Sequence, residues 1–286
     1  MRLCRFDDNR LGLVRGETVH DVSAALDLLP AVRWPLPPGD LLVANLARLR
    51  PEIERLAANA RGKPISSVRL LSPVANPTKI IGAPINYKDH IEESKKDQGI
   101  AYGRVLKSIG EFGLFLKANS ALVGPGEGVA LRFPDRRNDH EAELAVIIGR
   151  TGTKIPKAQA LSYIAAYAIG LDMTVRGSEV PSFRKSIDTY AVLGPWMVTA
   201  DEIADPDNLD FDLRVGDELR QKSNTRYLDF GVARLIEFAS EFYTLHPGDI
   251  IMTGTPAGVA PVVPGDVMTV TMQGIGQMQV AVRAAE

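Results

Sequence analysis

Two glutamates, Glu141 and Glu143, stand two positions apart at the start of an apolar run that continues to Ile148. Successive side chains of a strand point to opposite faces, so we expect both carboxylates on one face of a strand. Like charges at the edge of a core raise each other's pKa unless a cation lies between them. A bound metal ion is the simplest resolution, whereas a lone Glu-x-Glu pair more often lies on a solvated face.

A third carboxylate, Asp172, interrupts the apolar segment 165–175, where an unpaired charge would be costly. We therefore predict one metal site formed by Asp172 together with Glu141 and Glu143. Oxygen ligands favour a hard ion, Mg²⁺, Mn²⁺ or Ca²⁺, over zinc, and three protein ligands leave positions open for water and substrate. His140 is not expected to join them, because the strand period points it away from Glu141.

His90 and Glu93 are three residues apart and could touch on one turn of a helix. Glu93 would then orient the imidazole and raise its basicity, and His90 would take a proton from water. A His-x-x-Glu pair alone is more often a surface pair. The polar segment 91–99 is typical of a solvated surface loop in its composition, and a mobile lid is the functional alternative.

Two further segments have a structural and a functional interpretation. Arg184 and Lys185 are adjacent basic residues, which on their own indicate a basic surface turn. The segment 253–259 is glycine-rich and lacks the Gly-Lys-Ser/Thr ending of a phosphate-binding Walker loop. Its backbone N–H groups are better suited to a carboxylate or to turn formation.

Composition narrows the class of ligand and the compartment. The 286 residues are 45% hydrophobic and carry 33 Lys+Arg against 35 Asp+Glu, a net charge of −2 that argues against nucleic-acid binding and favours a small ligand. The single cysteine, Cys4, excludes an internal disulfide, as in a reducing compartment. Because no signal-like start and no apolar run of ~18 residues occurs, we expect a cytoplasmic protein without membrane contact.

The periodicity of the chain predicts an α+β protein dominated by strands. Residues 2–19 form a small β-rich unit, and apolar residues at helical spacing predict helices over 41–58 and 230–243. From about residue 73 onward, short apolar runs alternate with Gly and Pro, which is typical of a β-dominated domain. We expect a small N-terminal domain over 1–72 and a catalytic domain over 73–286.

Six motifs occur in an order that resembles the fumarylacetoacetate hydrolase family, in particular its bacterial acylpyruvase-like branch. They are Asn86-Tyr-x-x-His90-x-x-Glu93, Glu141-x-Glu143-Leu, Asp172-x-x-x-Arg176, Lys185-Ser-x-Asp-Thr, Gln221-x-Ser-Asn-Thr225 and Gly248-Asp-Ile-Ile-x-Thr-Gly-Thr-Pro-x-Gly. The match extends from about Lys79 to the C terminus. The N-terminal unit is similar to the small β-rich domain of many bacterial members.

The resemblance implies a mixed β-roll main domain, a homodimer and an Mg²⁺ ion, with Mn²⁺ as an alternative, on the three carboxylates. It implies that His90 and Glu93 activate water, that the segment after His90 is a lid, and that Lys185 is a second positive partner in catalysis. Substrate oxygens would be held by Arg176, Thr255 and Lys117.

The activity implied by the resemblance is hydrolysis of a carbon–carbon bond in an acylpyruvate, a small 2-oxo acid chelated by the metal. Family members also decarboxylate, hydrate or isomerise related 2-oxo acids, so an oxaloacetate-like decarboxylase or an isomerase is the alternative. A third interpretation is a non-catalytic 2-oxo acid binding protein, against which the presence of His90, Glu93 and Lys185 counts.

The chain departs from the family pattern at two places. Glu179 stands where a neutral amide is usual, and an anion near the substrate puts a second substrate carboxylate in doubt. Val215-Gly216 replaces Asn-Gly at a hairpin, a change expected to affect only the turn.

Overall fold

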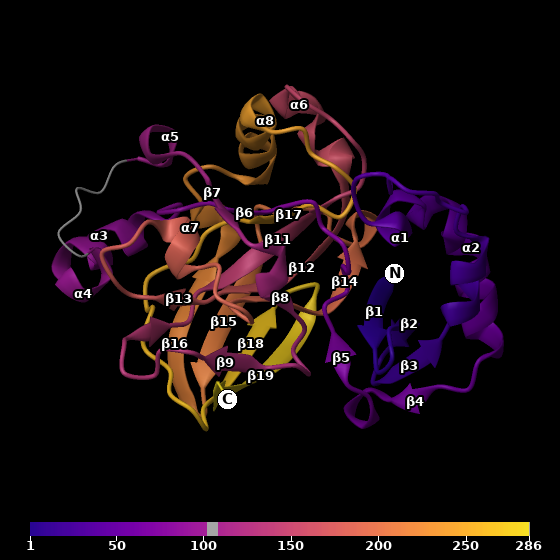
Figure 1. Cartoon of the computed structure of the whole chain (residues 1–286), viewed down its shortest axis with the longest axis horizontal. Coiled ribbons are helices and arrows are strands. Elements are labelled where there is room, and N and C mark those ends of the chain that lie inside the picture. Colours follow the sequence, from indigo (N-terminus) through magenta and orange to yellow (C-terminus); the bar gives the residue numbers. More distant parts are fainter. Residues whose placement is uncertain (102–107, 286) are drawn as a thin grey trace.

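A twelve-stranded mixed sheet forms the centre of the computed structural model, which describes residues 1–101 and 108–285 (Figure 1). Its strand order is β4-β3-β2-β1-β14-β12-β11-β17-β6-β7, with β5 beside β1 and β8 beside β14. The strands are β1 (Arg2–Phe6), β2 (Arg10–Arg15), β3 (Thr18–Asp21), β4 (Lys63–Pro64), β5 (Leu70–Leu71), β6 (Ile80–Gly82), β7 (Phe115–Lys117), β8 (Leu122–Val123), β11 (Ala142–Ile148), β12 (Ile164–Asp172), β14 (Ala191–Thr199) and β17 (Ile250–Met252).

A five-stranded sheet, formed by four strands from the C-terminal part and by β9 from the middle of the chain, packs against this central sheet. Its order is β16 (Glu218–Asn224), β15 (Asp210–Val215), β18 (Val267–Met272), β19 (Gly276–Ala284) and β9 (Val129–Leu131). A separate pair joins β10 (Asn138–Asp139) to β13 (Thr174–Val175). Both parallel and antiparallel neighbours occur, so the predicted β-dominated α+β class with a mixed main domain is confirmed.

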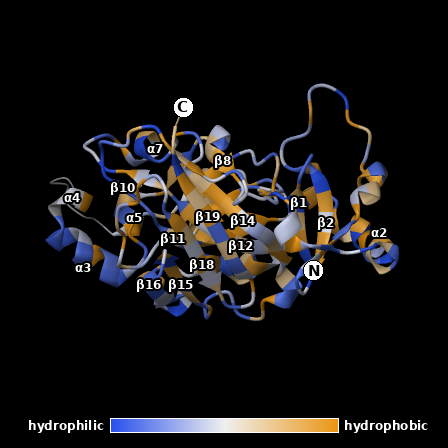
Figure 2. Cartoon of the chain, turned by 90° about the horizontal axis from the view of Figure 1, so that it is seen from below, coloured by the Kyte–Doolittle hydropathy of each residue, from blue (hydrophilic) through white to orange (hydrophobic). Residues whose placement is uncertain are grey.

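The central strands are buried on both faces, which explains why they appear in the sequence as continuous apolar runs. In β11, Leu144 and Val146 belong to an apolar core shared with the five-stranded sheet. The alternate residues Ala145 and Ile147 belong to a second core on the other face, which includes Leu49 of a helix described below. Figure 2 shows this apolar centre, with polar residues concentrated on the outer helices.

Eight α-helical segments lie around the sheets within the described residues. They are α1 (Leu41–Ala44), α2 (Leu46–Asn59), α3 (Lys88–Lys96), α4 (Gln98–Ala101), α5 (Ile109–Phe112), α6 (Lys157–Ala160), α7 (Pro181–Arg184) and α8 (Val232–Phe242). The helix predicted over 230–243 is α8, and the one predicted over 41–58 is divided into α1 and α2 at Asn45. None of the described helices has the length and apolar content needed to cross a membrane.

The polar segment 91–99 is largely helical, so the composition-based prediction of a surface loop is wrong. In α3 only His90 and Ser94, four residues apart, are buried. Neither is apolar, so the segment shows no helical period of apolar residues in the sequence. Acidic Asp89 in the first turn and basic Lys95 in the last turn complement the helix dipole. The lid interpretation stays a prediction, and its part over 102–107 lies outside the described residues.

The N-terminal strands continue the central sheet. Strand β1 pairs with β14 in antiparallel register, with Arg2 opposite Val198 and Leu3 opposite Met197. Figure 1 shows residues 1–72 gathered at one end of the molecule, with α2 on the outside. The division into domains at residue 72 stays a prediction.

Gly82 of β6 leaves room for the aromatic ring of its antiparallel partner, Phe115. A methyl group at Gly82 would lie 2.1 Å from ring atom Cζ of Phe115, which is itself buried. We expect Gly82→Ala to lower the free energy of unfolding by about 1–3 kcal/mol, because a filled core must shift to admit it. Urea denaturation of the purified variant measures this change.

Gly110→Ala is the control, since its added methyl group would lie 3.8 Å from the nearest side-chain atom, in Phe230. Equal stability of the Gly82→Ala variant and the unmodified protein would contradict this account of the packing.

Candidate active site

The three carboxylates predicted to bind metal converge at one end of two paired strands. Glu143 lies in β11, Glu141 directly precedes it, and Asp172 ends β12. The pairing of Ala142 with Leu171 places Asp172 opposite Glu141, and the Asp172 N–H donates to the Glu141 carbonyl at 2.9 Å. One oxygen of each carboxylate lies within 4.8 Å of the others, and all three residues are buried. We call these residues the carboxylate triad.

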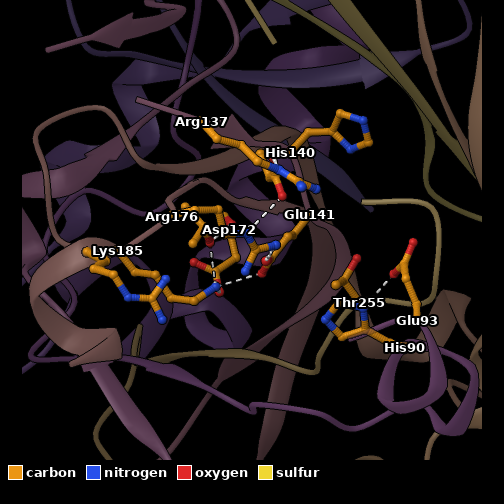
Figure 3. Close-up of polar contacts among 12 residues, drawn as sticks. His90, Glu93, Arg137, His140, Glu141, Asp172, Arg176, Lys185 and Thr255 are labelled. Atoms are coloured by element: carbon orange, nitrogen blue, oxygen red, sulfur yellow. Dashed lines mark hydrogen bonds and ion pairs between the residues drawn. The ribbon is translucent and has the colours of Figure 1, made fainter. Parts of the chain in front are cut away.

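Three cations lie against two members of the triad, and Figure 3 labels two of them, Arg176 and Lys185. Lys185 Nζ donates to Glu141 Oε2 at 2.6 Å and to Asp172 Oδ2 at 2.7 Å. Arg176 Nη2 donates to Glu141 Oε1 at 2.8 Å, and the ammonium of Lys117 donates to Asp172. Arg184 ends the short helix α7, Lys185 follows it, and both are buried, so the interpretation of a basic surface turn is wrong.

Glu143 differs from its two neighbours in having no cation in an ion pair among the described residues. Burial raises its pKa well above the ordinary value, and the charges of Asp172 and Glu141 raise it further. For Glu141, burial acts in the same direction, but the charges of Lys185 and Arg176 outweigh it and hold the pKa well below its usual range. Without a nearby cation Glu143 therefore favours its neutral form, and a bound divalent cation would favour its ionised form. The all-oxygen donor set of the triad suits such an ion.

The backbone of the glycine-rich loop after β17 contacts the triad. Gly254 N donates to Glu143 Oε2 at 2.7 Å, which confirms that the N–H groups of this loop suit a carboxylate. Thr255 lines the pocket, but its hydroxyl donates to the Ala142 carbonyl at 2.9 Å and accepts from Gln221 Nε2 at 2.8 Å. In this arrangement the hydroxyl holds the loop against the start of β11.

His90 and Glu93 form the expected contact on one turn of α3. His90 Nδ1 lies 2.9 Å from Glu93 Oε2, and Glu93 Oε1 accepts the N–H of Gly258 at 2.8 Å. An ionised carboxylate only accepts, so Nδ1 carries the proton and Nε2 is left able to accept one. Figure 3 shows this pair across the carboxylates from Lys185.

The carboxylate triad, Lys185 and His90 line one pocket. Its described wall combines these charges with apolar side chains. The lining residues are Ala83, Pro84, Ile85, His90, Ser94, Ile100, Phe112, Phe115, Glu141, Glu143, Asp172, Arg176, Pro181, Arg184, Lys185 and Thr255. Lys117, predicted to hold substrate, is not in this wall, and its ammonium is directed at Asp172 instead.

Two residues that raised questions in the sequence lie outside the triad. Glu179 is paired with Arg136 at 2.9 and 3.0 Å and is not part of the described pocket wall, so it places no bare anion there. His140 is fully buried, its Nδ1 lies 3.3 Å from Gln221 Oε1, and its ring points away from the carboxylates in Figure 3. Burial lowers the pKa of His140 to about 4.

Asp139 and Gln221 support the site without having been assigned a role in it from the sequence. Asp139 accepts from Arg176 Nε at 2.8 Å, and Gln221 Oε1 accepts from Ala142 N at 3.0 Å. A signal for Asp139 was present, because it continues the period of two back from Glu141. For Gln221 the only signal was its place in one of the six motifs, because no local pattern in the sequence indicates that its side chain contacts β11.

Comparison with known proteins gives a family match and full-length relatives. Residues 79–283 match the family model described as fumarylacetoacetate (FAA) hydrolase C-terminal. The chain is 54% identical over 286 residues to maleylpyruvate hydrolase of Aquipseudomonas alcaligenes, covering 99% of this chain and 100% of that protein. It is 38% identical to the mitochondrial oxaloacetate tautomerase Fahd2a of Rattus norvegicus, covering 71% of this chain and 64% of that protein.

A solved structure has the same fold over its whole length. It is the crystal structure of maleylpyruvate hydrolase from Sphingobium sp. SYK-6 in complex with manganese(II) ion and pyruvate, with a TM-score of 0.84 and 39% sequence identity. The alignment covers 100% of both chains.

The raised pKa of Glu143 predicts how the metal-free protein responds to pH. A folded-state pKa above the unfolded value means that this group contributes stability at pH below the unfolded pKa, and that the contribution is lost as pH rises through the folded pKa. Glu143→Gln cannot ionise, so with EDTA present its melting temperature should exceed that of the unmodified protein at pH 8. The difference should shrink toward pH 5.

Thermal unfolding followed by circular dichroism at both pH values measures this difference. Glu17→Gln, at an exposed position, is the matched control and should show no such trend. Excess Mn²⁺ should reverse the order at pH 8, because an ion that binds only the folded state stabilises it and needs the ionised Glu143. A Glu143→Gln variant that is less stable in EDTA at pH 8 would contradict the assignment.

Proposed function

The chain belongs to the fumarylacetoacetate hydrolase family, and from this membership we propose that it is a metal-dependent hydrolase that cleaves a carbon–carbon bond of an acylpyruvate. The observation that carries the proposal is the position of His90, which lines the same pocket as the carboxylate triad and is held by Glu93 at Nδ1. A metal site alone would serve several reactions of 2-oxo acids, whereas a positioned base beside it serves the addition of water.

The substrate we propose is maleylpyruvate, which hydrolysis would convert to maleate and pyruvate. Full-length relatives at 54% and 39% identity are named for this activity, and the second was crystallised with manganese(II) and pyruvate. The guanidinium of Arg184 in the pocket wall suits the second carboxylate of such a substrate. Because Glu179 is paired with Arg136, the objection to a second substrate carboxylate loses its basis.

Glu141, Glu143 and Asp172 would hold the metal, which we propose to be Mg²⁺ with Mn²⁺ as an alternative. Their oxygen-only set favours hard ions, and the manganese in the Sphingobium protein supports the choice. When bound, the ion supplies a Lewis acid for the 2-oxo-carboxylate end of the substrate.

His90 would accept a proton from water at Nε2, while Glu93 holds the ring through Nδ1. The water oxygen adds to the acyl carbonyl carbon, the bond from that carbon to the pyruvate methylene breaks, and the electron pair stays on the methylene carbon until it takes up a proton. The products are a carboxylic acid and pyruvate, so all atoms of substrate and water are accounted for.

Lys185 would stabilise negative charge that develops on the pyruvate part. Burial acts to lower its pKa, but the charges of Asp172 and Glu141 outweigh that effect and raise it. Lys185 therefore stays an ammonium and is unsuited to act as a base. Arg176 and Thr255 lie in the same wall and would bind substrate oxygens. Lys117 would act more indirectly, by holding Asp172.

A decarboxylase or an isomerase could use the same metal site without a water-activating pair. These alternatives are less favoured, because full-length relatives at 54% and 39% identity are named maleylpyruvate hydrolase, whereas a full-length relative named as an isomerase is 29% identical. The His90–Glu93 contact is also formed. A non-catalytic binding protein would have no use for that contact.

Product analysis separates these reactions. The purified protein with Mg²⁺ should convert acetylpyruvate to acetate and pyruvate, and maleylpyruvate to maleate and pyruvate, as measured by chromatography. It should not accelerate the loss of CO₂ from oxaloacetate. Release of CO₂ from oxaloacetate without cleavage of either acylpyruvate would replace the hydrolase proposal by the decarboxylase.

His90→Ala should lower kcat for acylpyruvate hydrolysis by a factor of about 10²–10⁴, the usual contribution of a general base. Calorimetric titration should show unchanged Mn²⁺ affinity, because His90 is not a ligand in the predicted set. His246→Gln replaces a histidine outside the pocket wall and should retain full activity. Undiminished hydrolysis by His90→Ala would show that water is activated by another group.

We also propose a homodimer in the cytoplasm. The resemblance supports the dimer, and the single cysteine and a small catabolic substrate support the compartment. A monomeric mass from light scattering of the purified protein would overturn the homodimer. Fractionation of source cells tests the cytoplasmic location.

A further inference from the structure

A line of alternating charges leads from the carboxylate triad to the end of helix α3. Arg176 donates through Nη2 to Glu141 and through Nε to Asp139, each at 2.8 Å. Asp139 in turn accepts from Arg137 Nε at 2.8 Å. The second arm of the same guanidinium, Nη1, donates to Asp97 Oδ2 at 2.7 Å. Four ion pairs thus connect a predicted metal ligand to the helix that carries His90 and Glu93.

The outer pair of this line is held in a defined geometry although it lies near the surface. The side chains of Arg137 and Asp97 are 27% and 39% exposed, whereas Asp139 is fully buried. Asp97 is the C-cap of α3, and its Oδ1 accepts the N–H of Gly99 at 2.8 Å, which orients the carboxylate. The hydrogen bond from Arg137 lowers the pKa of Asp97, so the carboxylate is ionised at neutral pH.

Helix α3 needs such an attachment because little else secures it. It has nine residues, a length that is marginal for an isolated helix, and only His90 and Ser94 are buried. Among the described residues, two hydrogen-bonded side-chain contacts connect it and its cap to the rest of the chain. One joins Glu93 to Gly258 N, and the other joins Asp97 to Arg137.

We propose that Asp97 and Arg137 form a latch that holds the His90–Glu93 pair in register with the carboxylate triad. The latch acts at the end of the helix, where the Asp97 N–H also donates to the Glu93 carbonyl at 2.9 Å. Asp97 and Arg137 are positioning residues, since neither lines the described pocket wall. The proposal rests on the proposed function in that it assigns the water-activating role to His90.

Asp97→Asn tests the latch with little change of shape, because it keeps the side-chain size and removes the charge. A partly exposed ion pair contributes up to about 1 kcal/mol, so release of the helix should lower kcat by about five-fold. KM and the stoichiometry of Mn²⁺ binding should stay unchanged, because the triad and the other substrate contacts are intact. Hydrogen exchange of the backbone over residues 88–96 should become faster.

Two matched variants distinguish the latch from a general effect on α3. Glu92→Gln removes the ion pair of Glu92 with Lys95, at 2.6 Å, which lies wholly on the same helix, and it should leave both kcat and exchange unchanged. Asp97→Glu restores the charge on a side chain one carbon longer and should recover part of the kcat lost in Asp97→Asn. A loss of kcat in step with a loss of Mn²⁺ stoichiometry would indicate partial unfolding and would overturn the latch.

The exchange measurement keeps this proposal separable from the proposed function. Unchanged exchange over 88–96 in Asp97→Asn overturns the latch, whatever the protein catalyses. Faster exchange with kcat within two-fold of the unmodified protein also overturns it, because the helix would then not position the reacting group. If the unmodified protein hydrolyses no acylpyruvate, the proposed function fails, and exchange alone decides whether the latch exists.

Discussion

Three buried carboxylates within 4.8 Å of one another impose the requirement that the rest of the site meets. Their repulsion in a desolvated place would be prohibitive without cations, and a buried ion pair that loses one partner is strongly destabilised. Lys185, Arg176 and Lys117 satisfy this requirement for Glu141 and Asp172. Glu143 has no cation in an ion pair among the described residues, so it is the member of the triad whose ionised form would need a bound metal ion.

The fold brings these charges together from segments that are far apart in the chain. The triad comes from the ends of β11 and β12, Lys117 from β7, and Lys185 from the turn after α7. Strands that are buried on both faces by two apolar cores give the triad a rigid support. A rigid support matters because preorganised charges stabilise a transition state without rearranging during the reaction.

His90, which we propose as the base, lies on a helix that is much less buried than the strands that carry the triad. Helix α3 makes few apolar contacts, and its polar composition would suit solvent as well as this site. The site therefore combines a deep, rigid charge cluster with a peripheral element whose position depends on a few polar contacts. The chain of ion pairs through Asp139 joins these two parts across the protein, and this is why a surface pair such as Asp97 and Arg137 bears on chemistry at the triad.

Local spacing in the sequence determined those features that involve neighbours along the chain. The period of two placed Glu141 and Glu143 on one face, and a spacing of three placed His90 beside Glu93, because these relations follow from the geometry of a strand and a helix alone. Only the tertiary structure decided that Asp172 lies opposite Glu141, that Lys117 holds Asp172, and that Glu179 is neutralised by Arg136. These pairings depend on strand register and on partners tens of residues away. The same holds for Lys185, which resembles a surface residue until the fold buries it between two carboxylates that require its charge.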